Sequence, residues 1–375
     1  MSPRSAIDGS EGAVIDEALA RKKAQRERFG PLEYVRLTDA FRGLPRGTAR
    51  FGEDVVPGYP PIGRVLNLEN GLRHHFEAPF HVEEKVDGYN VRIFRHQGEL
   101  LALSRGGFIC PFTTDRLPDL MAPAVFDAEP DLIVCAEVAG PGNPYLEGSP
   151  PGIEDDVVLF VFDLMRFGRP GFVPAAERYA LYERHRLPAV PAHGRFHPDR
   201  PAALREVLRE LDARGVEGVV LKEDSARQKR AKYVTPASVI QDISAMADGL
   251  MELPPEYFTN RLLRLALILE ESPELDRDGL RERLGAALLD PLLTAVRGYH
   301  DSHKVAHPFR CRFRGRENAE RFIEHLGRAP RSAIHARGFE LEREEDGYWV
   351  LTFERIFPRT TGLLANFLSG GQVYD

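Results

Sequence analysis

The alternation of apolar and polar residues is clearest in three short segments. Phe80–Val86 and Asn90–His96 alternate as half-buried strands do, and Glu99–Ser104 follows the second segment after a Gln97-Gly98 turn. Asp87-Gly88 lies between the first two segments and is typical of a tight hairpin turn. The pattern therefore predicts an antiparallel meander of three strands.

Other segments extend this pattern. Leu132–Val138 and Val157–Leu164 are further strand candidates, and residues 201–214 form an amphipathic helix with Pro201 near its start and Gly215 after its end. Val219–Lys222 and Ala231–Val234 are short strand candidates. Strands outnumber helices and few βαβ units occur, so we predict an α+β fold of mostly antiparallel sheets with flanking helices.

Residues 250–300 have a helical pattern. In one segment, apolar residues lie on nearly every side of the predicted helix: Leu262, Leu263, Leu265, Leu267, Ile268 and Leu269. A helix that is apolar over so much of its surface is buried, either in a core or against another subunit. The residues alone slightly favour an intramolecular core.

The two ends differ from the middle of the chain. Residues 11–28 predict a polar helix, and residues 43–71 are rich in Gly and Pro. Near the other end, Phe309–Phe313 and Tyr348–Phe353 predict strands, and Glu317–Leu326 predicts a helix. We therefore divide the chain into an N-terminal module (1–70), a central domain (71–242), a helical domain (243–306) and a small α+β domain (307–375).

Composition narrows the class of protein. The chain has 375 residues, 43% of them hydrophobic and 29% charged, which is typical of a globular protein. It contains no apolar run long enough to span a membrane and no apolar core of a signal peptide near its start. The three cysteines lie far apart, so we expect a cytoplasmic protein. With a formal charge of −7, any nucleic acid must bind to a local basic patch.

Lysine is scarce among the basic residues. Lys and Arg together number 50, but the sequence has only seven lysines: Lys22, Lys23, Lys85, Lys222, Lys229, Lys232 and Lys304. Arginine stays protonated in proteins, whereas a lysine can lose its proton and become a nucleophile. The scarcity directs attention to each remaining lysine.

Lys85 stands in the string Lys85-Val86-Asp87-Gly88-Tyr89-Asn90. By itself this string favours a hairpin turn that carries an incidental lysine. Five further motifs follow it in order: Ser104-Arg105-Gly106-Gly107, Ala136-Glu137-Val138-Ala139-Gly140, Phe160-Val161-Phe162-Asp163, Glu217–Lys222 and Lys229–Tyr233. The set resembles the collinear motifs of covalent nucleotidyltransferases, the superfamily of ATP-dependent ligases and RNA capping enzymes.

Details of these strings favour one branch of the superfamily. Asn90, five residues after Lys85, resembles the RNA ligase form of the first motif, where DNA ligases usually carry Arg. The strings EKVDGYNVRIF and SRGGFICPFTTDR and the helical region after residue 250 resemble the homodimeric, RNA-circularising third RNA ligase family. The resemblance implies an adenylyltransferase domain at 71–242 and dimerisation through 243–306. A DNA ligase usually adds an OB-fold after the last motif, whereas this chain continues with Leu-rich helices.

The resemblance implies a three-step reaction. A lysine, here Lys85, takes AMP from ATP and releases pyrophosphate; AMP then passes to an RNA 5′-phosphate, and a 3′-hydroxyl displaces it. An amine with an ordinary pKa of about 10.4 is protonated and inert at neutral pH. We therefore expect Lys232, desolvation and a bound magnesium or manganese ion to lower the pKa of Lys85.

The resemblance also implies roles for other residues. Lys85, Lys232, Glu217 and Arg105 would be catalytic. Glu217 would bind the metal, and Asp163 is a weaker candidate. The implied ATP-binding set is Glu83, Glu84, Asp87, Gly88, Asn90, Arg105, Glu137, Phe162, Lys222, Arg230 and Lys232.

Several of these roles have open alternatives. Glu137 would bind the ribose and Phe162 would stack on adenine, with Phe160 as the structural neighbour. Either Glu83 or Glu84 would read the adenine amino group. Lys222, Arg230 and Lys232 would face the triphosphate, and Lys229 could share that role. For each of these residues, the alternative is that it has only a structural role or lies in solvent.

The sequence therefore predicts an ATP-dependent RNA ligase. Its partners would be ATP, magnesium, single-stranded RNA with 5′-phosphate and 3′-hydroxyl ends, and a second copy of the chain, with no membrane. Rival interpretations are a DNA ligase, a capping-type nucleotidyltransferase and a non-catalytic RNA-binding protein on a ligase scaffold.

Overall fold

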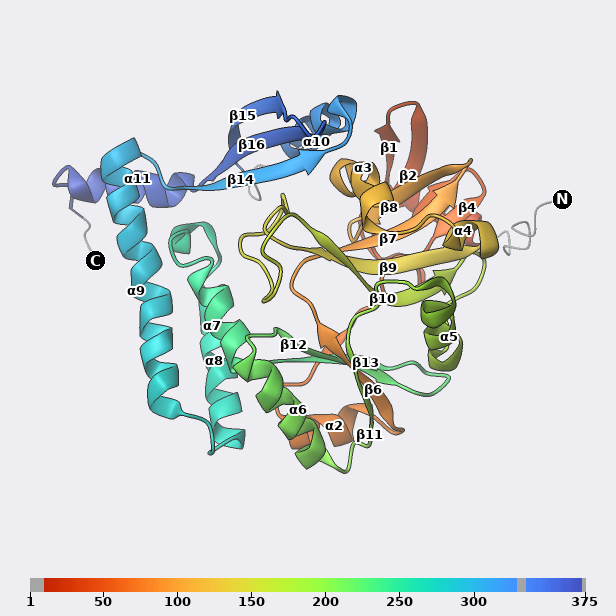
Figure 1. Cartoon of the computed structure of the whole chain (residues 1–375), viewed down its shortest axis with the longest axis horizontal. Helices are drawn as coiled ribbons and strands as arrows, with labels where there is room; N and C mark the ends of the chain where they lie inside the picture. Colours follow the sequence, from red (N-terminus) through yellow and green to blue (C-terminus); the bar gives the residue numbers. More distant parts are fainter. Residues whose placement is uncertain (1–9, 329–334, 373–375) are drawn as a thin grey trace.

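The computed structural model describes residues 10–328 and 335–372 and contains four β-sheets surrounded by helices (Figure 1). The first sheet, in spatial order, is β1-β2-β3-β4 (Ala24–Phe29, Leu32–Leu37, Ala49–Phe51, Asp54–Val56). The second is β10-β9-β7-β8 (Val158–Arg166, Leu132–Ala139, Tyr89–His96, Glu99–Ser104). The third is β11-β6-β12-β13-β5 (Ala192–Phe196, Phe80–Lys85, Gly218–Glu223, Arg230–Val234, Gly63–Arg64). The fourth is β14-β16-β15 (Ala306–Phe313, Trp349–Ile356, Ala336–Arg343).

The ladders are antiparallel apart from the β5–β13 pair, which is parallel. This confirms the predicted α+β class. Strand β9 is buried along its whole length because it lies inside the second sheet. Its unbroken apolar run, LIVCA, fits a strand with both faces covered.

The predicted three-strand meander is wrong at its first connection. Strand β6 belongs to the third sheet, whereas β7 and β8 pair in the second. Asp87-Gly88 therefore carries the chain from one sheet to the other instead of closing a hairpin. Gly88 is needed there because a Cβ atom would lie 2.4 Å from the carbonyl oxygen of Val138 on β9. The prediction of a hairpin turn at Asp87-Gly88 is therefore wrong, because β6 pairs with β12 and β11 and not with β7.

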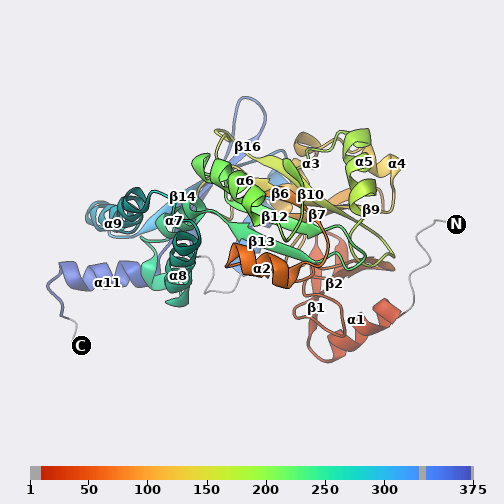
Figure 2. The same ribbon diagram turned by 90° about the horizontal axis from the view of Figure 1, so that it is seen from below.

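Two helices cover the outer face of the third sheet (Figure 2): α2 (Leu68–His75) and α6 (Pro201–Ala213). Leu204, Leu208 and Leu211 recur at helical spacing on α6 and pack into the same core as Leu72 of α2 and Val82 of β6. This face of the sheet is therefore closed, and the opposite face turns toward the second sheet.

The C-terminal part begins with helices. These are α7 (Pro236–Ser244), α8 (Glu256–Glu271), α9 (Arg277–Ser302) and, near the end of the chain, α11 (Pro358–Leu368). Leu265 and Ile268 of α8 are buried, but Leu263 is 61% exposed. One side of α8 therefore packs against the rest of the protein, and a second apolar side is exposed.

The fourth sheet, with α10 (Arg316–Arg328), folds back over the second sheet, as the blue segment in Figure 1 shows. Phe313 of β14 and Phe322 of α10 share one core with Phe112 and Val134 of the central region. Phe112 lies on α3 (Pro111–Leu120). The predicted strands and helix near 309–353 are present; strand β15 was not predicted.

The N-terminal helix is shorter than expected. Helix α1 spans Ser10–Ala20, and the residues predicted as its second half form strand β1. None of the helices in residues 10–328 and 335–372 is both long and apolar enough for a membrane span.

Candidate active site

Lys85 is the last residue of β6 and lies opposite Gly218 of β12. Its Nζ donates a hydrogen bond to a carboxylate oxygen of Glu217, the residue just before β12. The strand pairing fixes this contact, because Glu217 and Gly218 enter the sheet beside the point where Lys85 leaves it. The predicted nucleophile and the predicted metal ligand are therefore neighbours.

The electrostatics of this pair differ from the expectation. Burial acts to lower the pKa of Lys85, but the carboxylates of Glu217 and Glu137 outweigh it, and the pKa is raised. Burial raises the pKa of Glu217 to about 7 and that of Glu137 to about 8, although Lys85 opposes both shifts. Without nucleotide and metal the negative groups therefore dominate, and the lowering of the Lys85 pKa, which was expected with a bound magnesium or manganese ion, stays a prediction.

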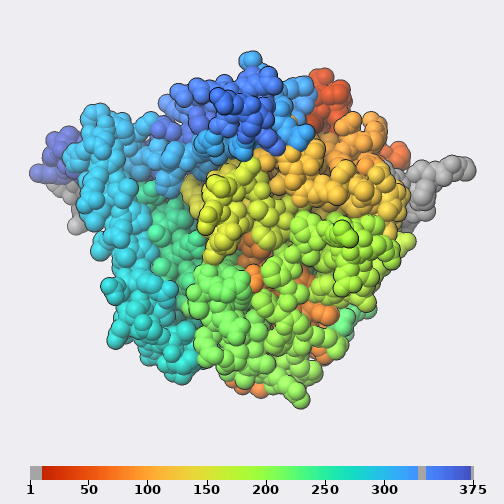
Figure 3. Space-filling model, viewed as in Figure 1, coloured from red at the N-terminus to blue at the C-terminus, as the bar shows by residue number. Residues whose placement is uncertain are grey.

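A cavity of about 260 Å³ lies between the second and third sheets, beside Lys85. It brings together most of the predicted site residues: Glu84, Lys85, Gly88, Asn90, Arg105, Glu137, Phe162, Asp163, Lys222, Arg230 and Lys232. Asp87 and Glu217 instead line an adjoining hollow of about 460 Å³, which Lys85 also lines. Figure 3 shows a recess on this face between the yellow 140–157 segment and the green segments.

Glu83 lies behind the cavity in a buried ionic cluster. Its carboxylate contacts Arg178 of α5 (Ala175–His185), the hydroxyl of Tyr179 and the amine of Lys222. Asp163 joins the same cluster, with Lys222 at 3.3 Å and Arg230 at 3.0 Å. These cations hold the pKa of Asp163 below its ordinary value although burial acts to raise it.

Three predictions change because of this cluster. Asp163 forms ion pairs with Lys222, Arg230 and Arg178, and these pairs argue against Asp163 as a metal ligand. Lys222 lines the cavity, but its amine donates to the carbonyl oxygen of Phe162, and this contact weakens the prediction that it faces the triphosphate. Arg230 also lines the cavity, and its guanidinium carbon lies 3.4 Å from the ring centre of Phe172; its pairing with Asp163 weakens the same prediction.

The carboxylate of Glu84 also pairs with neighbouring side chains. One of its oxygens lies 3.2 Å from Arg214 and 3.2 Å from His193. Neither predicted adenine reader therefore offers a free carboxylate to a base. Lys229 pairs at 2.8 Å with the exposed Glu77, which places its amine at the surface.

The remaining predicted residues present polar groups to the cavity. Asn90 donates to the carboxylate of Glu137, so the first motif and the third touch across β7 and β9. Phe162 lines the cavity, whereas Phe160 lines the adjoining hollow. This division agrees with the preference for Phe162 as the base platform.

Lys232 and Arg105 are the free cations of this set. Within residues 10–328 and 335–372, neither side chain forms a hydrogen bond or an ion pair. Burial and the nearby Arg64 and Lys85 lower the pKa of Lys232 to about 8. Two unpaired cations beside the predicted nucleophile Lys85 make a suitable place for a phosphate group.

The N-terminal module holds the loop that carries Arg105. Arg36 of β2 donates to the carbonyl of Gly106 at 3.4 Å and lies 3.7 Å above the ring of Phe108. Gly47 packs so closely that a Cβ atom would lie 2.1 Å from the carbonyl oxygen of Arg105. The buried Arg92 of β7 ties both sides together by donating to the carbonyls of Gly47 and Ser104.

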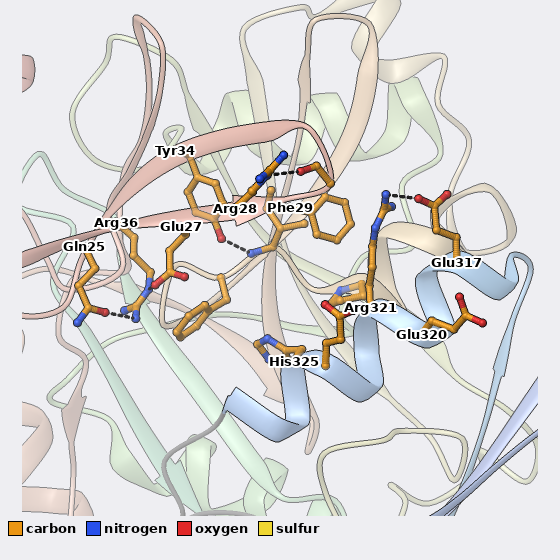
Figure 4. A pocket seen from close by; sticks show the side chains of 15 residues that line it. Gln25, Glu27, Arg28, Phe29, Tyr34, Arg36, Glu317, Glu320, Arg321 and His325 are labelled. Carbon is orange, nitrogen blue, oxygen red and sulfur yellow. Dashed lines mark hydrogen bonds and ion pairs between the residues drawn. The ribbon is translucent and has the colours of Figure 1, made fainter.

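Beside this loop lies a cavity of about 590 Å³ between the β1–β2 hairpin and α10 (Figure 4). Its charged side chains are largely paired within it: Arg36 with Glu27 at 2.8 Å, and Arg321 with Glu317. Tyr34 accepts a hydrogen bond from the backbone of Ile109. The cavity marks where the N-terminal module, the Arg105 loop and the C-terminal domain meet.

Sequence reasoning missed several residues at the site. Tyr59, Pro60, Pro61 and Ile62 form one wall of the cavity, although they were assigned to the N-terminal module. Their Gly/Pro-rich string marked a loop but not its destination. Arg178 carried no motif, because its role depends on contacts with residues almost a hundred positions away.

The groups that line the cavity suit ATP, and its carboxylates could provide some of the ligands of a magnesium ion. Free cations, an aromatic ring and a carboxylate line one cavity, as a nucleotide requires. Magnesium uses one or two carboxylates completed by phosphate oxygens, and Glu217 and Glu137 flank the Lys85 amine. The described residues contain no group of three His, Cys, Asp or Glu side chains that could hold a metal on its own, so phosphates would have to supply further ligands.

Comparison with known proteins places this site in a class. A family model described as RNA ligase matches residues 78–234, and one described as "Ligase Pab1020 C-terminal region" matches residues 246–371. The fold and site are those of an ATP-dependent ligase. The chain belongs to the ATP-dependent RNA ligase family.

The similarity to known proteins extends over almost the whole chain. Two structures of an archaeal ATP-dependent RNA ligase are 28% and 29% identical, with TM-scores of 0.84 and 0.86, and each match covers 99% of this chain and 98% of the other. A structure from Aquifex aeolicus, provisionally described as an ATP-dependent DNA ligase, is 48% identical over 97% of this chain and 100% of its own, with a TM-score of 0.92. An uncharacterized protein of Methanocaldococcus jannaschii is 26% identical over 366 residues, which cover 95% of this chain and 92% of that protein.

Proposed function

We propose that the protein joins 5′-phosphate and 3′-hydroxyl ends of single-stranded RNA, using ATP, through a lysyl-AMP intermediate on Lys85 and an RNA-adenylate. The observation that carries this proposal is the position of the Lys85 amine. It lies at a strand end, touches Glu217 and borders a cavity that also holds Phe162, Glu137 and the unpaired Lys232 and Arg105.

The chemistry assigns each residue a task. The Lys85 ammonium releases a proton, to Glu217 or to solvent, and its nitrogen forms a bond to the α-phosphorus of ATP as the bond to pyrophosphate breaks. Lys232 and Arg105 offset the charge that develops on the phosphate oxygens. Magnesium held by Glu217 would supply positive charge that favours the neutral amine.

The same site serves the later steps. The phosphoramide bond of Lys85-AMP breaks when an RNA 5′-phosphate oxygen attacks the phosphorus, and the amine recovers its proton. A 3′-hydroxyl then attacks the RNA 5′-phosphorus, and AMP leaves. When both ends belong to one strand, the product is a circle.

A second candidate is a DNA ligase, because the Aquifex aeolicus structure with that provisional description is 48% identical to this chain. Strands of the same sequence, one RNA and one DNA, with a 5′-phosphate and a 3′-hydroxyl, separate the two. We expect the RNA to be sealed at least tenfold faster, with part of the product circular and resistant to exonuclease. Equal or faster sealing of DNA would overturn the RNA assignment while leaving the Lys85 chemistry in place.

We also propose that the protein is a homodimer through its helical domain. The support is exposed leucines on α8 and α9, where Leu263, Leu289 and Leu293 are 61%, 62% and 51% exposed. Exposed large apolar side chains that cluster often mark a protein interface, and Leu289 and Leu293 lie one turn apart on α9. A second copy of the chain is the occupant that the family resemblance suggests.

A further inference from the structure

Three cations from three separate elements gather at one edge of the third sheet: Arg64, Lys232 and Arg264. Strands β5 and β13 pair in parallel with Arg64 directly beside Lys232. Paired residues in neighbouring strands point to the same face of a sheet. Arg64 therefore extends, by one strand, the face on which Lys232 lines the nucleotide cavity.

Helix α8 brings the third cation to the same edge. In its second turn, Arg261 pairs with Asp242 of α7 at 2.8 Å. At its last residue, Glu271 accepts the backbone N–H of Leu68, the first residue of α2, at 2.7 Å. Arg264 lies between these two contacts, one turn after Arg261, and Arg64 lies near enough to lower its pKa.

These cations have no direct pairing partner among the described residues, although Glu217 acts on all three from a distance and Asp242 acts on the two arginines. In the described part of the chain, the side chains of Arg64, Lys232 and Arg264 form no hydrogen bond and no ion pair, and Nε of Arg264 is buried without a partner. Burial, together with Arg64 and Arg261, lowers the pKa of Arg264 to about 10. Cations held this close without a partner favour an anion that carries several charges.

The position of the cluster indicates which part of a ligand would reach it. The adenine platform Phe162 lies over Lys222 of β12. From β12 the sheet continues to Lys232 on β13 and then to Arg64 on the edge strand β5, two strand spacings or roughly 10 Å further on. With adenine at Phe162 and the α-phosphorus at Lys85, a triphosphate would run outward along this row.

We propose that Arg64 and Arg264 bind the β- and γ-phosphates of ATP and so hold the pyrophosphate leaving group, next to Lys232. This inference rests on the proposed adenylation of Lys85. It assigns the helical domain a part in the first step of the reaction, through Arg264. An RNA phosphate has the same chemistry, and the test below distinguishes the two sources.

The test measures binding, which needs no turnover. In Lys85→Ala protein, which cannot form lysyl-AMP, calorimetry at fixed magnesium gives Kd for ATP, for AMP and for a 5′-phosphorylated oligoribonucleotide. With Arg264→Gln or Arg64→Gln added, we expect the Kd for ATP to rise at least tenfold and the Kd for AMP to stay within twofold. Arg264→Lys, which keeps the charge, should restore part of the ATP affinity.

Controls keep the test decisive. Arg281→Gln removes an exposed arginine that pairs with Asp278 on α9 and should leave all three Kd values unchanged. If Arg264→Gln fails to fold, Arg64→Gln on the separate strand carries the test. An unchanged ATP Kd in a folded variant, or a rise for RNA as large as that for ATP, overturns the inference. The proposed function fails separately, if wild-type protein takes up no AMP from ATP.

Discussion

Lys85 and Glu217 form an ion pair in which the amine donates a hydrogen bond to the carboxylate. Glu217 and Glu137 together outweigh the effect of burial and raise the pKa of Lys85. The nucleotide-free protein therefore holds its proposed nucleophile as an ammonium ion. Activation then depends on whatever removes or balances the negative charge of Glu217.

This pair makes a prediction about pH. The reactive form of Lys85 is the neutral amine, and a raised pKa means that adenylation speeds up as pH rises above neutrality. In metal-free protein, Glu217→Gln removes a charge that favours the ammonium, so the pKa of Lys85 should fall. The pKa is measured without metal, from the pH dependence of chemical modification of the Lys85 amine, because magnesium held by Glu217 would itself favour the neutral amine. A pKa that stays in place or rises in this metal-free measurement would show that Glu217 does not control the amine.

The buried cluster beneath Phe162 makes a prediction about stability. Arg178 contacts Glu83 and lies 3.2 Å from Asp163, and all three side chains are almost fully buried. Arg178→Met leaves two buried carboxylates short of a partner, and we expect a loss of about 3–5 kcal/mol in the free energy of unfolding. Chemical denaturation measures it. Arg184→Met, on the same helix but 65% exposed, is the control and should cost less than about 1 kcal/mol. A loss that small for Arg178→Met would contradict the structural role of the cluster.

The contact between Arg36 and the Arg105 loop predicts coupling between two remote segments. Arg36→Ala removes the support under Gly106 and Phe108, and we expect the rate of sealing to fall about ten- to a hundredfold through misplacement of Arg105. In Arg105→Ala protein the same change should have little further effect, because the group it positions is gone. A double-mutant cycle measures this.

The matched control is Arg28→Ala. Arg28 lies on the neighbouring strand β1 and lines the same cavity, but it donates to the carbonyl of Gly30 and not to the loop (Figure 4). It should leave the rate nearly unchanged. Equal losses for Arg28→Ala and Arg36→Ala, or additive losses for Arg36→Ala and Arg105→Ala, would argue that Arg36 does not act through Arg105.

The exposed leucines predict the oligomeric state. Leu289 and Leu293 lie one turn apart on α9, and the double change to Glu places charges on the proposed interface. Light scattering should give the mass of two chains for the wild type and of one chain for the double variant, with circular dichroism unchanged. Leu146→Glu, which alters an exposed leucine outside these helices, should remain dimeric. A single-chain mass for wild-type protein at micromolar concentration would contradict the dimer.

The sequence predicted much of the secondary structure of the central region, because several strands either alternate or form an unbroken apolar run, and Gly or Pro follows them within two residues. It misplaced β6, because β6 pairs with β12, more than a hundred residues later in the chain, whereas β7 pairs with β8 and β9. A local turn signal carries no information about which sheet a strand joins.

The same limit of local signals applies to the site. The motifs identified the residues around the cavity, which lie on strands of the second and third sheets and on the loop after β8. They did not reveal which cations are free. Lys222 and Arg230 carry motif positions but are paired with Asp163, whereas Arg64 and Arg264 carry no motif and lack partners in the described structure. Pairing depends on burial and on distant carboxylates, which a single sequence does not show.

The measurement that tests the central claim most directly is the location of the adenylate. Purified protein is incubated with ATP and magnesium without RNA, digested under conditions that preserve phosphoramide bonds, and mapped by mass spectrometry. We predict one AMP on the peptide that contains Lys85, and none on Lys85→Ala protein, while the exposed-site control Lys23→Ala labels like the wild type. No adenylate, or an adenylate on another lysine, would contradict the account.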